Sequence, residues 1–319
     1  ATIGISVYPD DGTTATALLK HADMAMYHAK KEGRNCYRFF SETMRVHATR
    51  RFFIEKKLSK ALERGELVLF YQPRIDIQTL AVVGMEALLR WRQPDEDFLA
   101  PGEFIPVAEE NGLIIPIGDW VLQEACRQAA AWRAAGLPEL VVSINLSTVQ
   151  FRHWLLADRL RQVLASTGID PACIELELTE SVLMEDTKLS ASLLSQIKDL
   201  GIRVALDDFG TGYSSFAYLK RFALDTLKID TSFVSDLARD PGDAAIVSAM
   251  IALGQQLGLQ VVAEGVEYAN QLQFLRSRGC DEAQGYLFSP PLEASRFEEW
   301  VRNREQGSLL SSPRRVAGM

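Results

Sequence analysis

The sequence predicts an α/β fold, a (β/α)8 TIM-like barrel whose first strand is antiparallel to the rest, preceded by a short N-terminal strand-helix-strand segment. From residue 66 onward, eight short apolar segments alternate with longer helical patterns over roughly 240 residues, which is typical of such a barrel. Only six residues, 76–81, separate the first two apolar segments. A parallel crossover needs about a dozen residues or more, so we expect this pair to form an antiparallel hairpin.

The N-terminal segment contains a strand in "ATIGISVYP", a helix that ends at Gly33, and a second strand in "NCYRFF". A piece of this size is too small to bury a core of its own, so we interpret it as the end of a neighbouring domain. An amphipathic helix is expected next, at 47–65. The expected organisation is a domain fragment, a linker with a leading helix, the barrel and a flexible tail, at residues 1–40, 41–65, 66–306 and 307–319.

Each barrel strand is expected where apolar residues form a short run. Helical patterns lie between most of these runs, as at 117–136 and 244–258, and the second pattern closes on Gly258, where a helix C-cap is expected. The eight expected strands are 66–75, 82–91, 141–147, 174–180, 203–209, 226–230, 260–266 and 283–288.

Composition excludes several classes of function. The chain is 47% hydrophobic and 24% charged, as in ordinary globular proteins, and its net charge of −8 argues against binding of a nucleic acid polymer. The four cysteines form no CxxC pair and the four histidines form no HxxxH or HExxH motif, which argues against disulfides and zinc. Without an 18-residue apolar run or a signal peptide, we expect no membrane contact and a cytoplasmic location.

Polar residues gather where the predicted strands end. In a barrel of this kind, the carboxyl ends of the strands carry the chemistry. Each residue alone has an ordinary interpretation as a surface, turn or ion-pair residue. Together they are unusual, because strands buried on both faces should be almost wholly apolar. The residues at these ends are Glu86, Asn145, Glu177, Glu180, Asp207, Asp208, Lys228, Glu264 and Gln284.

Adjacent carboxylates in "RVALDDFGTGYSS" favour a site for hard divalent cations. Asp207 and Asp208 would repel each other unless a positive charge offsets them. Mg²⁺ and Mn²⁺ prefer carboxylate, amide and water oxygens. Two neighbouring aspartates can serve two cations about 3.5–4 Å apart, the separation common in phosphoryl-transfer sites. The glycines that follow, Gly210 and Gly212, allow a tight loop beside such a site.

Seven segments resemble the motif series of the EAL-domain cyclic di-GMP phosphodiesterases, in the family's order: "EALLRW", "SINLS", "ELTES", "DDFGTGYSS", "LKID", "AEGVE" and "QGYLFSPP". The resemblance covers about 46–305. Residues 1–40, with "TIGIS" and "HADMAMYHAKKEGRN", resemble the C-terminal end of a GGDEF diguanylate cyclase domain. The GGDEF signature is missing from the chain, so no cyclase activity is expected of it.

The resemblance implies a role for each site residue. Lys228 would orient or deprotonate the attacking water, and Glu180 would hold the loop from Asp207 to Ser215. Glu86, Asp207 and Glu264 count among the catalytic residues. Two Mg²⁺ or Mn²⁺ ions would be bound by Glu86, Asn145, Glu177, Asp207, Asp208 and Glu264. Arg74 in "YQPRID" receives no role. The residues expected to bind substrate are Gln72, Arg90, Asp208 and Gln284.

The implied reaction is metal-dependent hydrolysis of cyclic di-GMP to linear pGpG. The alternative is a non-catalytic receptor or scaffold that binds cyclic di-GMP in the same pocket. Family members commonly pair through the region after the Asp207–Asp208 turn, near "SSFAYLKRF", so a homodimer is expected. Upstream domains could tether the full-length parent to a membrane.

Overall fold

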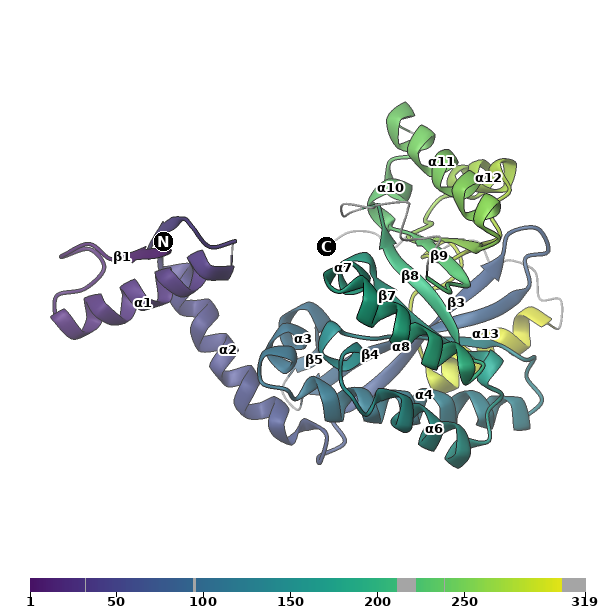
Figure 1. Ribbon diagram of the computed structural model, residues 1–319, viewed down its shortest axis with the longest axis horizontal. Coiled ribbons are helices and arrows are strands. Elements are labelled where there is room, and N and C mark those ends of the chain that lie inside the picture. Colours follow the sequence, from purple (N-terminus) through teal and green to yellow (C-terminus); the bar gives the residue numbers. More distant parts are fainter. Residues whose placement is uncertain (32, 94–95, 211–221, 238, 306–319) are drawn as a thin grey trace. The chain divides into compact units, whose positions relative to one another are not determined.

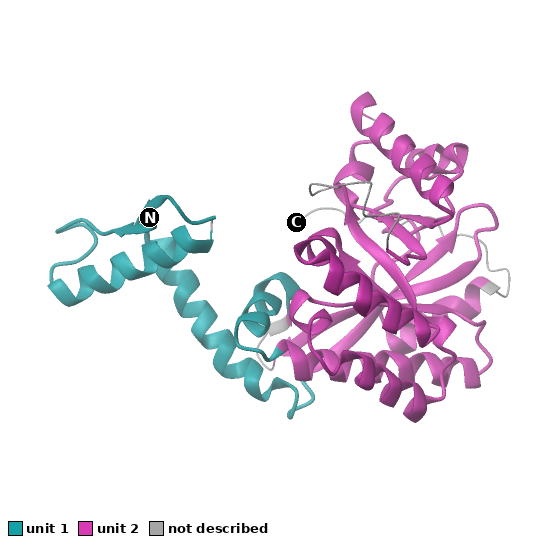
Figure 2. Ribbon diagram, viewed as in Figure 1, with its two compact units in different colours: residues 1–66, 99–113 teal, residues 67–98, 114–319 magenta. Residues whose placement is uncertain are grey.

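The computed structural model describes residues 1–31, 33–93, 96–210, 222–237 and 239–305 (Figure 1). The chain divides into two compact units, which Figure 2 distinguishes by colour. Unit 1 consists of Ala1–Glu66 and Leu99–Leu113, and unit 2 consists of Leu67–Phe98 and the described residues from Ile114 onward. The segment expected to mediate dimerisation, near residues 214–222, lies almost entirely outside the described residues.

Unit 1 begins with the expected strand-helix-strand segment. Strand β1 (Ile3–Ile5) pairs in parallel with β2 (Tyr37–Phe39), and α1 (Ala15–Lys31) connects them. The helix lies directly on the first strand, since a Cβ at Gly4 would be 2.0 Å from the carbonyl oxygen of Ala22. The unit also contains α2 (Glu42–Ala61), which begins earlier than the expected leading helix, and α3 (Pro101–Glu110).

Unit 2 is the predicted eight-stranded barrel, and the reversed first strand is confirmed. Strand β3 is antiparallel to both of its barrel neighbours, β4 and β11, whereas the remaining barrel pairs are parallel. The barrel strands are β3 (Leu67–Asp76), β4 (Val82–Gln93), β6 (Val141–Asn145), β7 (Ile174–Thr179), β8 (Arg203–Phe209), β9 (Thr226–Ile229), β10 (Gln260–Ala263) and β11 (Glu282–Ala283).

The last strand is much shorter than the expected 283–288. Its pairing ends at Ala283, because the chain turns at Gly285, whose φ is +156°. A Cβ on this glycine would lie 2.2 Å from the carbonyl oxygen of Val266, so only glycine allows the two backbones to approach so closely. The turn keeps Gln284 beside the end of β10, where its backbone N–H donates to the carbonyl of Ala263 at 2.9 Å.

Helices surround the strands of unit 2 (Figure 1). The outward face of β3 packs against two of them, because the ring of Tyr71 lies 4.8 Å from that of Trp132 in α4 and 6.0 Å from that of Phe297 in α13. Helix α11 ends at Gly258 in the left-handed conformation, as expected. The helices are α4 (Ile114–Ala134), α5 (Thr148–Phe151), α6 (Leu156–Thr167), α7 (Glu180–Glu185), α8 (Thr187–Asp199), α10 (Thr231–Ser235), α11 (Pro241–Leu257), α12 (Ala269–Arg278) and α13 (Ala294–Glu305).

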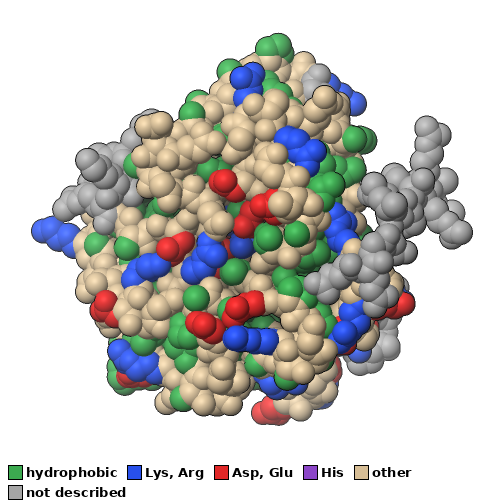
Figure 3. All heavy atoms as spheres, turned by 90° about the vertical axis from the view of Figure 1, so that its right-hand side faces the viewer, with side chains coloured by type: hydrophobic (Ala, Val, Ile, Leu, Met, Phe, Trp, Pro, Cys, Tyr) green, Lys and Arg blue, Asp and Glu red, His purple; other side chains and the backbone are tan. Residues whose placement is uncertain are grey.

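Two shorter strands extend the sheet beyond the barrel: β5 (Glu96–Leu99) follows β4, and β12 (Leu292–Glu293) pairs with β3. All four cysteines are free thiols. On the face drawn in Figure 3, acidic and basic side chains are interspersed and do not gather into one basic patch. None of the helices in the described part of the chain combines the length and the apolar character needed to cross a membrane.

Candidate active site

The strand register brings the predicted polar residues to one end of the barrel. Gln72 of β3 pairs with Glu86 of β4, and Asn145 of β6 is level with Glu177 of β7. Because β3 runs opposite to its neighbours, Gln72 faces the site from near the middle of that strand. The fold therefore brings together polar residues from strands that are far apart along the chain.

Lys228 of β9 lies at the centre of these side chains and is 1% exposed. Its ammonium Nζ is 2.6 Å from Glu264, 2.7 Å from Glu177 and 3.1 Å from Asp207. A fourth carboxylate, that of Glu86, is 3.9 Å away. One buried cation thus contacts carboxylates from four other strands or strand ends.

A chain of amide groups positions the Glu86 carboxylate. Asn145 donates a hydrogen bond to its Oε1 at 2.6 Å, and Gln284 donates to its Oε2 at 2.6 Å. The same amide nitrogen of Gln284 is 3.0 Å from the side-chain oxygen of Gln72. Gln72 in turn donates to the backbone carbonyl of Ser289 at 3.1 Å. Ser289, which follows the short strand β11, is a contact that the sequence did not indicate.

The two adjacent aspartates occupy an irregular end of β8. The pairing between β8 and β9 shifts register between Leu206 and Phe209, and Asp208 adopts a left-handed backbone with φ of +53°. Asp is among the residue types that tolerate this conformation. Burial raises the pKa of Asp208, and the neighbouring Asp207 carboxylate raises it further. The two adjacent carboxylates therefore repel each other in the absence of a bound cation.

Two further residues expected in the site, Glu180 and Arg90, are located on α7 and β4. Glu180 is the first residue of α7 and is 3% exposed. Most of the loop that it was expected to hold, from Asp207 to Ser215, lies outside the described residues. Arg90 is half-buried on β4, with its guanidinium 5.9 Å from the centre of the Phe70 ring. Burial lowers the pKa of Arg90, which the nearby Glu86 opposes.

The crowded carboxylates make the electrostatics of the cluster unusual. Burial alone would lower the pKa of Lys228, but the four carboxylates, Asp207 foremost, outweigh it and raise that pKa well above its usual value. Burial raises the pKa of Glu264 to about 8 and that of Glu177 well above its usual value, although Lys228 opposes both shifts. Lys228 is therefore a permanent cation, but one ammonium does not keep the pKa of every surrounding carboxylate in its usual range.

The donor atoms at this end of the barrel fit a hard divalent cation. They are carboxylate and amide oxygens, which Mg²⁺ and Mn²⁺ prefer. Three of them, Oε1 of Glu177, Oδ1 of Asp207 and Oε1 of Gln284, are buried and accept no hydrogen bond. In the described residues, no three His, Cys, Asp or Glu side chains are already arranged around one cation position, and the Lys228 ammonium lies among the carboxylates. The residues able to hold a cation are Glu86, Asn145, Glu177, Asp207, Asp208 and Glu264.

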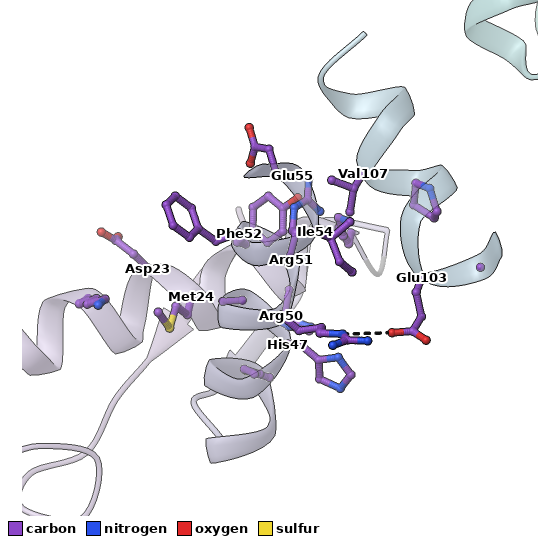
Figure 4. Close-up of a pocket in the computed structure, with 18 residues that line it drawn as sticks. Asp23, Met24, His47, Arg50, Arg51, Phe52, Ile54, Glu55, Glu103 and Val107 are labelled. Atoms are coloured by element: carbon purple, nitrogen blue, oxygen red, sulfur yellow. Dashed lines mark hydrogen bonds and ion pairs between the residues drawn. The ribbon is translucent and has the colours of Figure 1, made fainter. Parts of the chain in front are cut away.

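A groove of about 980 Å³ lies in unit 1, between α1, α2 and α3 (Figure 4). Its lining includes apolar side chains such as Met24, Ile54 and Val107. Arg50 and Glu103 point toward each other there and form an ion pair at 3.4 Å. The groove contains no ring of carboxylates around a buried cation, so the barrel end is the better candidate for chemistry.

Known families match both parts of the chain. The EAL domain family matches residues 55–291, and the family described as diguanylate cyclase, GGDEF domain, matches residues 1–36. The bifunctional diguanylate cyclase/cyclic di-GMP phosphodiesterase MucR of Pseudomonas aeruginosa is 46% identical over 297 residues, which are 93% of this chain and 43% of MucR. The cyclic di-GMP phosphodiesterase PdeR of Escherichia coli is 42% identical over 300 residues, which are 94% of this chain and 45% of PdeR.

A solved structure is also similar to this chain. The MucR phosphodiesterase in complex with c-di-GMP has a TM-score of 0.75 and 45% identity, and the match covers 77% of this chain and 99% of that one. The chain spans less than half the length of MucR and PdeR themselves.

Proposed function

This chain belongs to the EAL domain family, and we propose that it hydrolyses cyclic di-GMP to linear pGpG with two bound Mg²⁺ or Mn²⁺ ions. The observation that carries the proposal is the buried Lys228 surrounded by four carboxylates at the carboxyl ends of the barrel strands. The names of MucR and PdeR as cyclic di-GMP phosphodiesterases support the choice of substrate.

Bound divalent cations would activate water and neutralise charge on the phosphate. The chain's own residues prepare the site for them. Glu86 is held in one orientation by the amides of Asn145 and Gln284, so its carboxylate needs no rearrangement. We assign the metals to Glu86, Asn145, Glu177, Asp207, Asp208 and Glu264.

Lys228 acts as a positively charged group that orients the attacking water. A general base would have to lose its proton near neutral pH, and the carboxylates around Lys228 raise its pKa instead. We expect Lys228→Arg to retain most of the kcat that Lys228→Ala loses. Equal, near-complete loss in both variants would contradict this role.

Arg90 contributes to binding of the substrate phosphate. Arg90 is half-buried and lies on the same strand as Glu86, four residues further along. A guanidinium with two parallel N–H donors suits phosphate oxygens. We expect Arg90→Lys to raise KM for cyclic di-GMP more than it lowers kcat.

The decisive experiment incubates the protein with cyclic di-GMP and Mg²⁺ or Mn²⁺ and separates the products by chromatography. The matched control is Glu86→Gln, which keeps the shape of the side chain and removes its charge. Linear pGpG from the wild type, and little from the control or in EDTA, would support the proposal. Binding of intact cyclic di-GMP with either metal would instead favour a receptor. Light scattering on the same samples tests the expected homodimer.

A further inference from the structure

Below the candidate active site, the barrel interior contains a second layer of polar side chains. Six strands that carry a site residue also carry a second residue that faces the barrel interior. This second residue is two positions away along the strand, further from the site end of the barrel. A strand rises about 3.3 Å per residue, so the two layers are roughly 7 Å apart. The polar second-layer residues are Arg74, Ser143, Glu175, Thr226 and Glu282, under Gln72, Asn145, Glu177, Lys228 and Gln284 respectively, and Gly84, which has no side chain, lies under Glu86.

Arg74 is the centre of this second layer and is 1% exposed. Its Nη1 donates to Ser143 Oγ at 2.8 Å and to Oε1 of Glu175. Its Nε is 3.0 Å from Oε2 of Glu282, an ion pair without hydrogen-bond geometry. Thr226 joins the network by donating to Oε2 of Glu175 at 2.5 Å. The guanidinium therefore connects β3, β6, β7 and β11 directly, and β9 through Glu175.

The interior is shaped to admit this guanidinium. A Cβ at Gly84 would lie 3.2 Å from Nε and 3.3 Å from Nη2 of Arg74, and 2.8 Å from the carbonyl oxygen of Val141. Glu175 is fully buried, and its carboxylate accepts hydrogen bonds from Arg74, Ser143 and Thr226. These three donors hold Glu175 in one position in the barrel interior.

Packing alone does not account for such a network. Buried ion pairs are often no more stabilising than apolar residues of the same volume. Their best-supported benefit is the fixing of one arrangement among several. In this barrel, Arg74 connects the strands that carry four residues of the candidate active site. These residues are Gln72, Asn145, Glu177 and Gln284, each two positions along its strand from the second layer.

We propose that Arg74 is a positioning residue that fixes the barrel strands in the register needed for metal binding and hydrolysis. This inference rests on the proposed function, because it concerns the same site. The essential feature is that the planar guanidinium presents two nitrogens at once: Nη1 contacts Ser143 and Glu175 while Nε lies beside Glu282. A lysine at this position would keep the charge but has only one nitrogen for these contacts.

The test measures two quantities that a purely structural role would not change together. The first is the Kd for Mn²⁺ by titration calorimetry, and the second is the division of any loss between kcat and KM for cyclic di-GMP. Changes to groups that orient metal ligands typically cost about 10–100-fold in metal affinity or activity. We expect Arg74→Met to weaken Mn²⁺ binding by about this factor and to lower kcat with little change in KM.

Stability is separated from positioning by a charge-balanced variant. Arg74→Met combined with Glu175→Gln and Glu282→Gln removes all three charges of the network. Arg203, which lies 3.7 Å from Glu175, loses this ion pair but is a quarter exposed and keeps its hydrogen bond to Gln260, so Tm should stay near that of the wild type. We expect its Mn²⁺ affinity and kcat to remain reduced. If that variant does not fold, Arg74→Lys is used in its place to test the proposal. We expect Arg74→Lys to bind Mn²⁺ several-fold more weakly than the wild type while its secondary structure is unchanged.

A matched control is Lys198→Met, which removes the cation of an ion pair with Asp225 at 2.7 Å outside the barrel interior. This control should change neither Mn²⁺ affinity nor kcat. The inference is wrong if the charge-balanced variant, or Arg74→Lys in its place, binds Mn²⁺ and turns over within about twofold of the wild type. Failure of the wild type to hydrolyse cyclic di-GMP would refute the proposed function alone, because Mn²⁺ affinity still tests Arg74.

Discussion

Removing the charge of Lys228 should destabilise the metal-free protein, and the loss should shrink when metal binds. Lys228→Met keeps the length and most of the volume of the side chain but removes the ammonium. Four carboxylates then remain buried without the cation that lies 2.6–3.9 Å from them. The perturbation therefore tests whether the cluster depends on positive charge.

The expected magnitude follows from the burial of the pair. Breaking a buried ion pair by removing one partner typically costs about 3–5 kcal/mol. For a domain of this size, 1 kcal/mol shifts Tm by roughly 2–4 °C, so the variant should unfold about 6–20 °C lower in EDTA. The deficit should be larger at pH 8.5 than at pH 6. Burial raises the pKa of Glu264 to about 8 while Lys228 opposes the shift, so removal of the ammonium raises this pKa further. At pH 6 the group is protonated in both proteins, whereas at pH 8.5 it ionises at less cost in the wild type than in the variant.

The assay is thermal unfolding of the wild type and Lys228→Met, in EDTA and in saturating Mn²⁺, at both pH values. The control is again Lys198→Met, the same substitution at a partly exposed ion pair, for which a loss of about 0–1 kcal/mol is expected. Bound Mn²⁺ should recover much of the Lys228→Met deficit, because it supplies positive charge to the same carboxylates.

Two results would refute this reasoning. One is a deficit in EDTA at pH 8.5 no larger than that of Lys198→Met, which would mean that the carboxylates do not need the ammonium. The other is a large deficit that is identical with and without Mn²⁺ although calorimetry shows that the variant binds the metal.

Three further predictions concern other parts of the chain. Gly84→Ala should cost about 1–3 kcal/mol in urea unfolding with an unchanged m-value, because the new Cβ would lie 2.8 Å from the carbonyl oxygen of Val141; an unchanged midpoint would contradict the close packing. Burial raises the pKa of Cys126 from 9.0 to about 12. The stabilisation contributed by this neutral thiol is therefore complete below pH 9 and is lost as pH rises through about 12. Iodoacetamide at pH 8 should leave Cys126 unmodified in the folded protein, and rapid modification would contradict its burial. Glu110→Gln should weaken the partly exposed ion pairs of Glu110 with Lys31, at 2.6 Å, and with Arg51, by about 0.5 kcal/mol each, and should speed amide hydrogen exchange in α1, whereas unchanged exchange would mean that these pairs do not stabilise the helix.

The sequence by itself determined the barrel and its reversed first strand. Eight apolar runs at regular spacing allow few other arrangements, and the six-residue gap at 76–81 forbids a parallel crossover whatever the rest of the fold does. It also indicated the central polar residues, because a charged side chain such as Lys228 at the end of a buried strand is informative without any knowledge of its neighbours.

Only the tertiary structure decided which of these groups touch and what lies beneath them. Whether Arg74 faces Glu175 and Glu282 depends on the register with which distant strands close into a barrel, and register is a property of pairs of strands rather than of one segment. The left-handed backbone of Asp208 likewise accompanies a shift in the pairing of β8 with β9, and β11 ends early where Gly285 approaches the backbone of Val266. Local sequence patterns record the period and length of an element, whereas contacts across the barrel interior depend on all eight strands at once.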